Sequence, residues 1–349
     1  MTAPSTTGAP QQAPGAPAAS RPTAAAERPG GGLDVRQVLG RVPPVWWAFL
    51  GLLLVSVVAI RSSGDVLLSS TNVQSVAVAT TALGLVALGQ TVAMLVGSFD
   101  LSVAWTVSLG AVVTAAVMDG RGSMVVPAVL AALAAGAVVG VVNGLVVTKL
   151  GVNALIATLA TSLLLNGLLN SAVETRAGGV SEGFRELGYG QVGPLPLSFL
   201  VVALLAVGLA VVLRSTTFGH HVYAVGGSVD VARVSGIRSD RVVLAAHVIC
   251  GVFAAAAGVY LASRLGSPDA GLGPRGGYDL ESIAVVVLGG TVLGGGRGTV
   301  AGTAGGVAIF ALLETAFDVL GVDPFLKTVL EGVIIVAAVA SHTLRRVRS

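Results

Sequence analysis

The sequence has few charged residues, few aromatic residues and only one cysteine. Asp, Glu, Lys and Arg make up 11% of the 349 residues, whereas a soluble domain carries about 25%. Aromatic residues make up 5%, which argues against the aromatic girdles of a membrane β-barrel. Cys250 has no second cysteine to pair with and no metal-binding spacing around it. These absences exclude an ordinary soluble domain, an internal disulfide and a cysteine-based metal site.

Apolar and small residues dominate the chain instead. Hydrophobic residues make up 54% of it, its mean hydropathy is +0.89, and it contains 48 glycines. Small residues allow helices to approach closely in a bilayer, where no hydrophobic force draws them together. The basic residues flank apolar runs and do not alternate with stacking aromatic residues, so nucleic-acid binding is not expected. The composition predicts an all-α polytopic membrane protein.

Ten apolar runs follow a polar N-terminal region. Residues 1–42 are rich in Pro, Ala, Gly, Ser and Thr, which predicts a disordered tail. The membrane domain is expected over residues 43–342 and a basic tail over 343–349. A spanning helix needs about 20 apolar residues, and one run, 281–293, is short and rich in glycine. The predicted spans are 44–61, 73–97, 100–118, 124–148, 153–173, 195–214, 241–264, 281–293, 298–318 and 325–341.

The basic residues predict the orientation of these spans. With ten spans and a cytoplasmic N-terminus, thirteen of the 20 Lys and Arg residues fall inside and seven outside. This bias agrees with the positive-inside rule, and the arginines at 345, 346 and 348 put the C-terminus inside as well. The chain is therefore expected to cross a membrane with both termini in the cytoplasm.

The glycine-rich stretch at 289–302 is the one segment that resembles a nucleotide-binding loop. It lacks the Lys–Ser/Thr pair of a phosphate loop and lies between two apolar runs. A tight turn with close helix packing explains it better than nucleotide binding. The chain is not expected to hydrolyse ATP by itself or to hold a cofactor.

The longest predicted cytoplasmic loop, Ser215–Arg241, contains a short amphipathic segment. Ser228 can cap a helix there and Gly236 can end it, with Gly226 and Gly227 forming the turn before it. A short helix on this face suits docking into a groove of a partner. The alternative is an ordinary helix lying at the membrane surface.

This loop resembles the cytoplasmic coupling loop of the simple-sugar permeases of ATP-binding cassette importers, the ribose, arabinose and xylose type. Two positions depart from the family pattern, since Ser228 replaces an asparagine and Val231 an alanine. Ser228 is still able to cap a helix. The matching positions are Thr216, Gly219, Tyr223, Ala224, Gly226, Ala232, Gly236 and Ile237.

Three further stretches carry the same resemblance. VGSFDLSVAW at 96–105 is similar to the family's G-G-I-D-L-S-V-G segment, and LGVNALIATLATSLLLNGL at 150–168 to its L-G-V-N-P-F-I-A-T-L-G-T segment. The glycine-rich stretch at 276–306 is similar to G-Y-E-L-x-x-I-A-A-V-V-I-G-G-T-S-L-x-G-G-R-G. The four motifs occur in the family's order and extend the resemblance over about residues 45–341.

The resemblance implies a transport subunit of a bacterial inner membrane that works with other chains. Two cytoplasmic ATPase subunits would hold ATP and magnesium, an extracytoplasmic binding protein would deliver the solute, and a second permease copy would complete the pathway. Substrate would cross by alternating access. The residues expected at the ATPase-docking helix are Gly226, Asp230, Ala232, Arg233, Gly236 and Ile237.

Polar residues within the spans are candidates for the translocation path. A neutral sugar needs hydrogen-bond donors and acceptors but no counter-charge, so amides and hydroxyls suit it. Each of these side chains can alternatively make an interhelical hydrogen bond worth about 0.6 kcal/mol. The candidates are Gln90, Thr91, Asn143, Thr158, Thr161, Asn166 and Asn170.

Four charged residues near the spans are further candidates for a functional role. Asp100, expected near the inner end of a hairpin, can cap the following helix or line the path. Arg297 can pair with a carboxylate or anchor to headgroups. Glu314 or Glu331 would be the coupling site of an ion- or proton-driven carrier working alone, which is the alternative from another class. Within the importer class, the alternatives are a nucleoside, an autoinducer-like furanose or a branched-chain amino acid as the solute.

Overall fold

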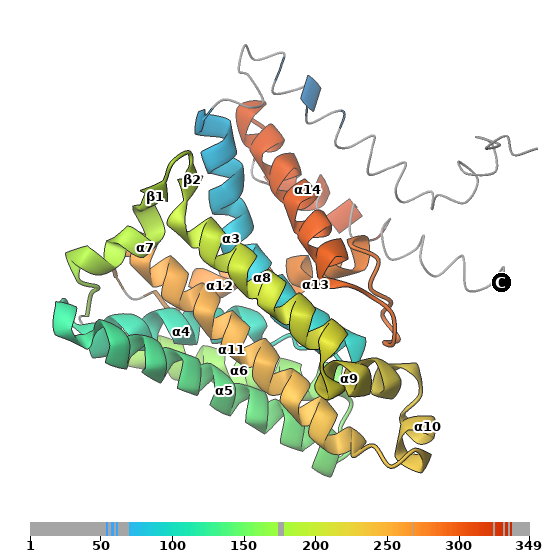
Figure 1. Ribbon diagram of the computed structural model, residues 1–349. Coiled ribbons are helices and arrows are strands. Elements are labelled where there is room, and N and C mark those ends of the chain that lie inside the picture. The colour runs from blue at the N-terminus through green and yellow to red at the C-terminus, as the bar shows by residue number, and fades with distance from the viewer. Residues whose placement is uncertain are drawn as a thin grey trace, which may run out of the picture. The chain divides into compact units, whose positions relative to one another are not determined.

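The computed structural model, drawn in Figure 1, describes most of the membrane domain. The chain divides into Met1–Val42 and Pro43–Ser349, and every described residue belongs to the second unit. Most of the predicted span 44–61, part of the predicted span 325–341 including Glu331, and both predicted tails lie outside the described residues. The described residues are 70–173, 178–267, 269–323 and 325–330, with Leu54, Val57, Val58, Arg61, Gly332, Val333 and Val336.

Within this described part, six helices are long and apolar enough to cross a membrane, and a seventh is shorter. They coincide with seven of the predicted spans to within a few residues at each end, because long apolar runs mark spanning helices directly. The six are α3 (Ser70–Leu95), α5 (Val125–Lys149), α6 (Ala154–Val173), α8 (Leu197–Ser215), α11 (Ser239–Leu265) and α14 (Val300–Val319), and the shorter one is α4 (Val103–Met118).

Short elements connect these helices. A two-stranded antiparallel hairpin precedes α8, and two consecutive helices, α9 and α10, join α8 to α11. The short elements are η1 (Gly122–Met124), η2 (Glu182–Arg185), α7 (Glu186–Tyr189), β1 (Gln191–Val192), β2 (Leu195–Pro196), α9 (Thr217–Gly227), α10 (Val229–Val234), α12 (Leu272–Arg275) and α13 (Tyr278–Leu288).

The predicted span at 281–293 is not a complete spanning helix. It corresponds to α13, which has 11 residues and a length of about 16 Å at 1.5 Å per residue. The hydrocarbon core of a bilayer is about 30 Å thick. The chain leaves the helix at Gly289 and Gly290, whose φ of +92° is left-handed. The glycines thus end the helix where the apolar sequence continues.

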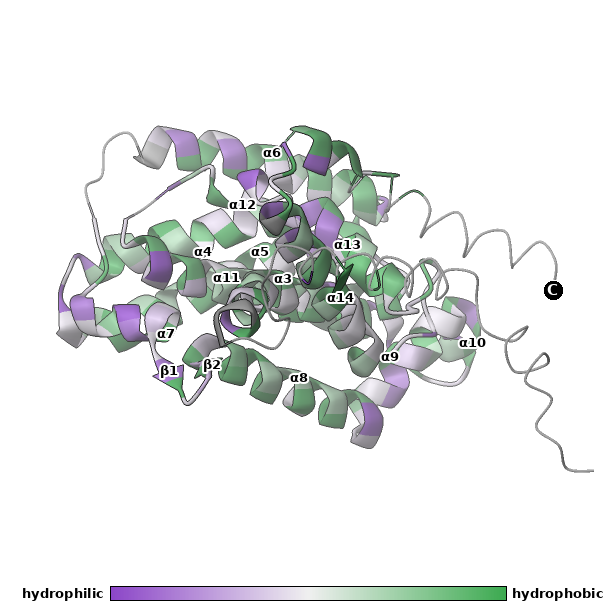
Figure 2. Ribbon diagram, turned by 90° about the horizontal axis from the view of Figure 1, so that it is seen from above, coloured by the Kyte–Doolittle hydropathy of each residue, from purple (hydrophilic) through white to green (hydrophobic). Residues whose placement is uncertain are grey.

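Helix α3 is the most deeply buried of the long helices, and we call it the central helix; it packs against α8, α11 and α14. In its most apolar stretch 83% of the residues are buried, compared with 22–28% for α5, α6 and α8. The peripheral helices expose large apolar side chains such as Leu130, Leu163 and Leu204. Figure 2 shows α8, at one edge of the bundle, coloured mostly as hydrophobic. An apolar periphery around a buried core is the surface that a lipid bilayer requires.

Glycines allow α5 and α11 to cross at backbone distance. A Cβ atom added to Gly140 would lie 2.3 Å from the carbonyl oxygen of His247, and one added to Gly136 would lie 2.3 Å from that of Gly251. Neither position has room for a methyl group. The two glycines of α5 therefore fix the separation of the two helices that hold the buried polar residues described below.

Replacing Gly140 by alanine is expected to destabilise the bundle by about 1–3 kcal/mol, the usual cost of overpacking. The measurement is the midpoint of thermal unfolding of the purified chain in detergent. The control is Gly167→Ala on α6, where an added Cβ has no atom within 4 Å. Because alanine forms helix better than glycine, the control should unfold at or above the wild-type midpoint. Equal midpoints for the two variants would contradict the crossing.

Candidate functional site

Helices α9 and α10 form one end of the bundle, where α8 ends and α11 begins. The N-cap of α9 is Thr216, whose side chain accepts a hydrogen bond from the Gly219 N–H at 3.3 Å. The N-cap of α10 is Ser228, which accepts from the Val231 N–H at 3.3 Å. Gly236 follows α10 with a φ of +83°. The predicted cap at Ser228 and the predicted end at Gly236 are both confirmed.

The predicted turn at Gly226 and Gly227 is wrong, since both residues lie in the last turn of α9. Gly226 instead meets the end of α3 and the glycine-rich loop. A Cβ there would lie 1.8 Å from the Leu95 carbonyl oxygen and 2.4 Å from the Gly296 nitrogen. Gly296 N–H also donates to that Leu95 oxygen at 2.9 Å. Three segments far apart in the sequence therefore meet through their backbones.

Two more glycines complete this contact, which we call the glycine joint (Leu95, Gly97, Gly226, Gly295 and Gly296). Gly295 and Gly296 have φ of +84° and +74°, a conformation that side chains disfavour. A Cβ on Gly295 would lie 2.7 Å from the Gly97 nitrogen. The glycine-rich loop is thus a packing surface, as its sequence predicts.

Helix α10 presents a mixed face to solvent. Among the predicted docking residues, Asp230, Arg233 and Gly236 are exposed, Ile237 is half-buried, and Ala232 is buried. Exposed side chains that the sequence analysis did not select are Val231 and Val234, the latter 91% exposed. An exposed valine pair flanked by charges is a surface that a partner can cover.

An ion-pair group holds the start of α11 to α5 and α10. The Asp240 carboxylate lies 3.1 Å from Lys149 Nζ and 3.4 Å from Arg233 Nη2. All three side chains are partly exposed, so the attraction is screened by water. The group orients α10 relative to the spanning helices rather than adding much stability.

A buried polar cluster lies between α5, α11 and the loop before α4. We call it the Asp100 cluster, and its members are Ser98, Asp100, Ser102, Asn143 and His247, all at most 4% exposed. Asp100 Oδ1 accepts from Ser102 N–H at 2.9 Å and from Ser102 Oγ at 2.6 Å. Asn143 Nδ2 lies 3.2 Å from Asp100 Oδ2 and 2.8 Å from Ser102 Oγ.

His247 closes this cluster from α11. Its Nδ1 is 3.5 Å from Asp100 Oδ2, and its Nε2 is 2.8 Å from Ser98 Oγ. The sequence analysis missed His247, Ser98 and Ser102. An imidazole in the middle of an apolar span was the available signal, because ionisable groups within spans are rare and are usually paired.

Asp100 lies deeper in the bundle than its sequence position predicts. Its partner His247 is eight residues beyond Ser239, where α11 begins, which is about 12 Å along the helix. The loop of residues 96–102 therefore enters the bundle instead of turning at its end. Asp100 does bond the first turn of α4 through Ser102, as the capping interpretation predicts, but Ser102 itself occupies the N-cap position.

The predicted path residues divide into a buried group and an outward-facing group. Thr158 is buried and accepts from the Leu101 N–H at 3.0 Å, which ties α6 to the loop around Asp100. Thr161 is also buried. Asn166 is half-buried, Asn170 is exposed, and the two bond each other. Helix α6 thus presents amides on an otherwise apolar outer face.

Two further path candidates lie on the central helix. Gln90 is fully buried, and its Oε1 lies 3.5 Å from Cys250 Sγ, while its Nε2 has no hydrogen-bond partner among the described residues. Thr91 bonds Thr303 of α14 at 2.7 Å. The Thr91 contact is an interhelical hydrogen bond, whereas Gln90 keeps a donor available inside the bundle.

The charged candidates do not resemble an ion-coupling site. Glu314 Oε1 lies 3.3 Å from Lys327 Nζ, and the same Lys327 lies 3.3 Å from Asp318. Arg297 is exposed and makes no ion pair among the described residues. No group of three metal-binding side chains occurs in the described ranges. Glu314 is therefore compensated by a lysine rather than held free for a proton or cation.

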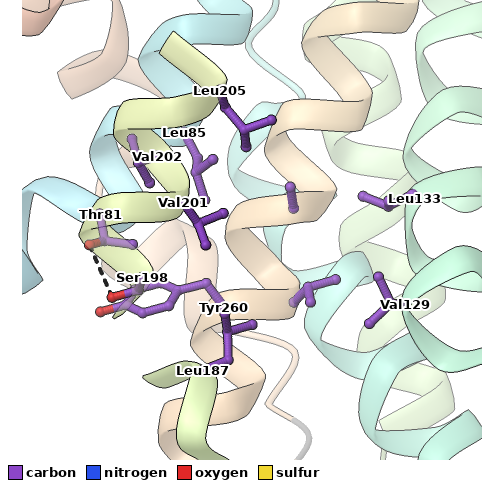
Figure 3. Close-up of a pocket in the computed structure, with 12 residues that line it drawn as sticks. Thr81, Leu85, Val129, Leu133, Leu187, Ser198, Val201, Val202, Leu205 and Tyr260 are labelled. Carbon is purple, nitrogen blue, oxygen red and sulfur yellow. Dashed lines mark hydrogen bonds between the residues drawn. The ribbon is translucent and has the colours of Figure 1, made fainter. Parts of the chain in front are cut away.

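An apolar cavity of about 200 Å³ is lined by side chains of α3, α5, α7, α8 and α11. Figure 3 shows Leu85, Leu133 and Leu205 facing into it. Its hydroxyl-bearing residues gather at one side, where Thr81 Oγ1 and Ser198 Oγ lie 3.4 Å apart. A sugar requires many hydrogen-bond partners, so this cavity does not suit one.

The comparisons with known proteins agree with the resemblance. The family model described as "Branched-chain amino acid transport system / permease component" matches residues 72–339. The galactose/methyl galactoside import permease protein of Haemophilus influenzae is 34% identical, covering 75% of this chain and 83% of its own length. No solved structure matches the chain.

Two Escherichia coli relatives are equally similar. Its ribose import permease protein is 35% identical, covering 73% of this chain and 80% of the relative. Its L-arabinose transport system permease protein is 37% identical, covering 77% and 81%. The family model's range includes the glycine joint and the Asp100 cluster. The chain therefore belongs to the simple-sugar permease family of ATP-binding cassette importers.

Proposed function

We propose that this chain forms half of the translocation path of a monosaccharide importer and that partner ATPases dock at α9 and α10. The relatives named above import ribose, arabinose or galactose. Ionisable side chains inside the described bundle are few, and the buried carboxylate of Asp100 is occupied by its own cluster. An interior without free charges suits a neutral solute.

The observation that carries this proposal is the glycine joint. Helix α9 contacts the end of α3 through Gly226 and Leu95, and it contacts the loop before α14 through Gly226 and Gly296. Because no side chains lie between these backbones, a displacement of one segment must move the segments that it contacts. A force on α10 would thus reach the central helix and α14 together, which is what alternating access requires.

The orientation follows from the charges at the α9–α10 end. If this end faces the cytoplasm, the positive-inside rule is obeyed, and the ATPases have access to the exposed face of α10. Ten passes with both termini inside remain the proposed topology, with α12 and α13 together replacing one full span. The basic residues near this end are Lys149, Arg214, Arg233, Arg238, Arg241 and Arg297.

A second copy of the chain and a solute-binding protein complete the proposed transporter. The amides of the half-buried Asn166 and the exposed Asn170 on α6 would face the second copy or the path between the copies. The binding protein would deliver the sugar at the opposite end of the bundle. ATP and magnesium would be held by the ATPase subunits and not by this chain.

The docking proposal predicts that Val234→Asp and Arg233→Glu each abolish sugar uptake. The first puts a charge into the most exposed apolar position of α10, and the second breaks the contact with Asp240 and reverses the charge. The assay is ATP-driven uptake of labelled ribose, arabinose and galactose by proteoliposomes containing both permease and ATPase. Copurification of the ATPase is measured in parallel and should fall by at least about tenfold.

Arg121→Glu is the matched control, because Arg121 is exposed at the opposite end of the bundle. It should leave ATPase copurification unchanged. Accumulation of a sugar by the permease alone under an ion gradient would contradict the importer proposal. Normal copurification of the ATPase with both α10 variants would contradict the proposed docking site.

A further inference from the structure

A second cavity lies at the α9–α10 end, where two spanning helices reach the edge of the bundle. Its volume is about 350 Å³, within the range of small-molecule sites. Its floor and walls come from the first turn of α9, the chain after α10 and the first turn of α11. The residues that line it and enter the argument are Phe218, His221, Ile237, Arg238, Arg241 and Val242.

The polar part of this lining is entirely basic or neutral. Arg238 and Arg241 are exposed and make no ion pair among the described residues, and His221 lies beside them. The nearest carboxylate in sequence, Asp240, is taken up by Lys149 and Arg233. Two guanidinium groups facing one cavity without a protein carboxylate form a site for an anion, and guanidinium pairs especially well with phosphate.

The other part of the lining is apolar. Val242 is buried, and Phe218 and Ile237 are half-buried at the cavity wall. A free inorganic anion would gain nothing from these side chains. A ligand that carries a phosphate on an apolar body would use both halves of the cavity.

The position of the cavity along the spanning helices favours a lipid over other ligands of this kind. Phe218 is three residues after α8 ends at Ser215, and Arg241 is in the first turn of α11. Both spanning helices therefore change from apolar to polar at this level, which is where headgroups lie. Above it, α8 exposes Leu204, Val207 and Val211, an apolar face along which acyl chains can run.

We propose that this cavity binds the phosphate headgroup of an anionic phospholipid in the cytoplasmic leaflet. Basic pockets at the cytoplasmic ends of spanning helices are suited to such headgroups. The ligand would contact Ile237, just after α10, and Phe218 on α9. The bound lipid would thus stabilise the position of α10 relative to α11. This inference requires that the chain spans a membrane with this end inside, but it does not require that an ATPase docks there.

The test is binding of phosphatidylglycerol by the full-length chain. The purified protein in detergent is titrated with phosphatidylglycerol, phosphatidylcholine or inorganic phosphate, and thermal midpoints and lipids retained in native mass spectrometry are measured. Wild type should be stabilised by phosphatidylglycerol alone. Arg238→Gln/Arg241→Gln should weaken this binding by about thirtyfold, the combined effect of two basic residues near an anionic surface.

Arg121→Gln/Arg214→Gln is the matched control, since it removes the same charge from two exposed arginines outside the cavity. It should bind phosphatidylglycerol as wild type does. Arg238→Lys/Arg241→Lys keeps the charge and should retain most of the binding, so a folding defect in the glutamine variant is distinguishable from a lost site.

Three outcomes would overturn the lipid proposal. One is equal stabilisation of wild type by phosphatidylglycerol and phosphatidylcholine. Another is full stabilisation by inorganic phosphate, which would make the cavity a site for soluble anions. The third is unchanged lipid binding by the glutamine variant with lost ATPase copurification, which would assign the arginines to the protein interface. Failure of ATPase docking alone leaves the lipid result unaffected, so the two proposals fail separately.

Discussion

Replacing Gly226 by alanine is expected to abolish transport, whereas replacing Gly227 by alanine leaves it near the wild-type level. The two glycines are neighbours in the last turn of α9. A methyl group on Gly226 would lie 1.8 Å from the Leu95 carbonyl oxygen, and the obstructing atoms are backbone that cannot rotate away. The same methyl group on Gly227 has no atom within 4 Å.

The measurement is ATP-driven sugar uptake, with membrane insertion checked by surface accessibility of the chain. Helix α9 must move away from α3 or from the glycine-rich loop to admit the alanine, so uptake should fall by about a hundredfold. Some of this loss can come from destabilisation, and the thermal midpoint is therefore recorded for both variants. Wild-type uptake by Gly226→Ala would show that the glycine joint is not needed for coupling.

Exchanging Asp100 for asparagine is expected to destabilise the bundle by about 2–4 kcal/mol. The substitution keeps the shape but removes the negative charge, and it places an amide N–H₂ among donors that need an acceptor. Ser102 and Asn143 would each lose part of a hydrogen bond to the carboxylate, and an unsatisfied buried polar group costs about 1–3 kcal/mol. A matched exposed carboxylate, Asp230, should tolerate the change to asparagine with a loss below about 0.5 kcal/mol.

A double-mutant cycle with His247→Gln measures whether the two residues act as a pair. Removing one member of a buried polar pair costs more than removing both, because the remaining group is left without its partner. The double variant should therefore be more stable than the sum of the single losses predicts, by at least about 1 kcal/mol. Unfolding in detergent gives the three free-energy differences. Strict additivity would mean that the 3.5 Å approach of His247 to Asp100 carries no interaction.

The two substitutions probe different parts of the same molecule. The glycine joint lies at the α9–α10 end and connects the proposed docking helix to α3 and α14. The Asp100 cluster lies about 12 Å inside the bundle and connects α5 and α11 to the loop that follows α3. Leu95 and Asp100 are five residues apart, so the segment between them links the two sites. A displacement of α9 would accordingly reach the buried cluster through this short segment.

Much of this protein is determined by local sequence. The apolar runs identify seven helices because a bilayer demands about 20 apolar residues in succession. Ser228 and Gly236 mark the limits of α10, because capping and left-handed turns depend on neighbouring residues alone. The four motifs are enough to identify the family. Each of these conclusions rests on residues that are close together in the chain.

The tertiary structure alone decided which residues meet. Gly226 belongs to a backbone contact rather than a turn, and this depends on Leu95 and Gly296, more than a hundred and about seventy residues away. His247 pairs with Asp100 because α11 crosses α5 at the depth where the loop before α4 enters the bundle. Helix α13 ends before it can span a bilayer, and Asn170 is exposed although its position within an apolar run did not reveal which way it faces. Periodicity and composition describe each helix separately. The depth of a residue in the bundle, the direction in which its side chain points and the residues that it contacts are set by how the helices pack.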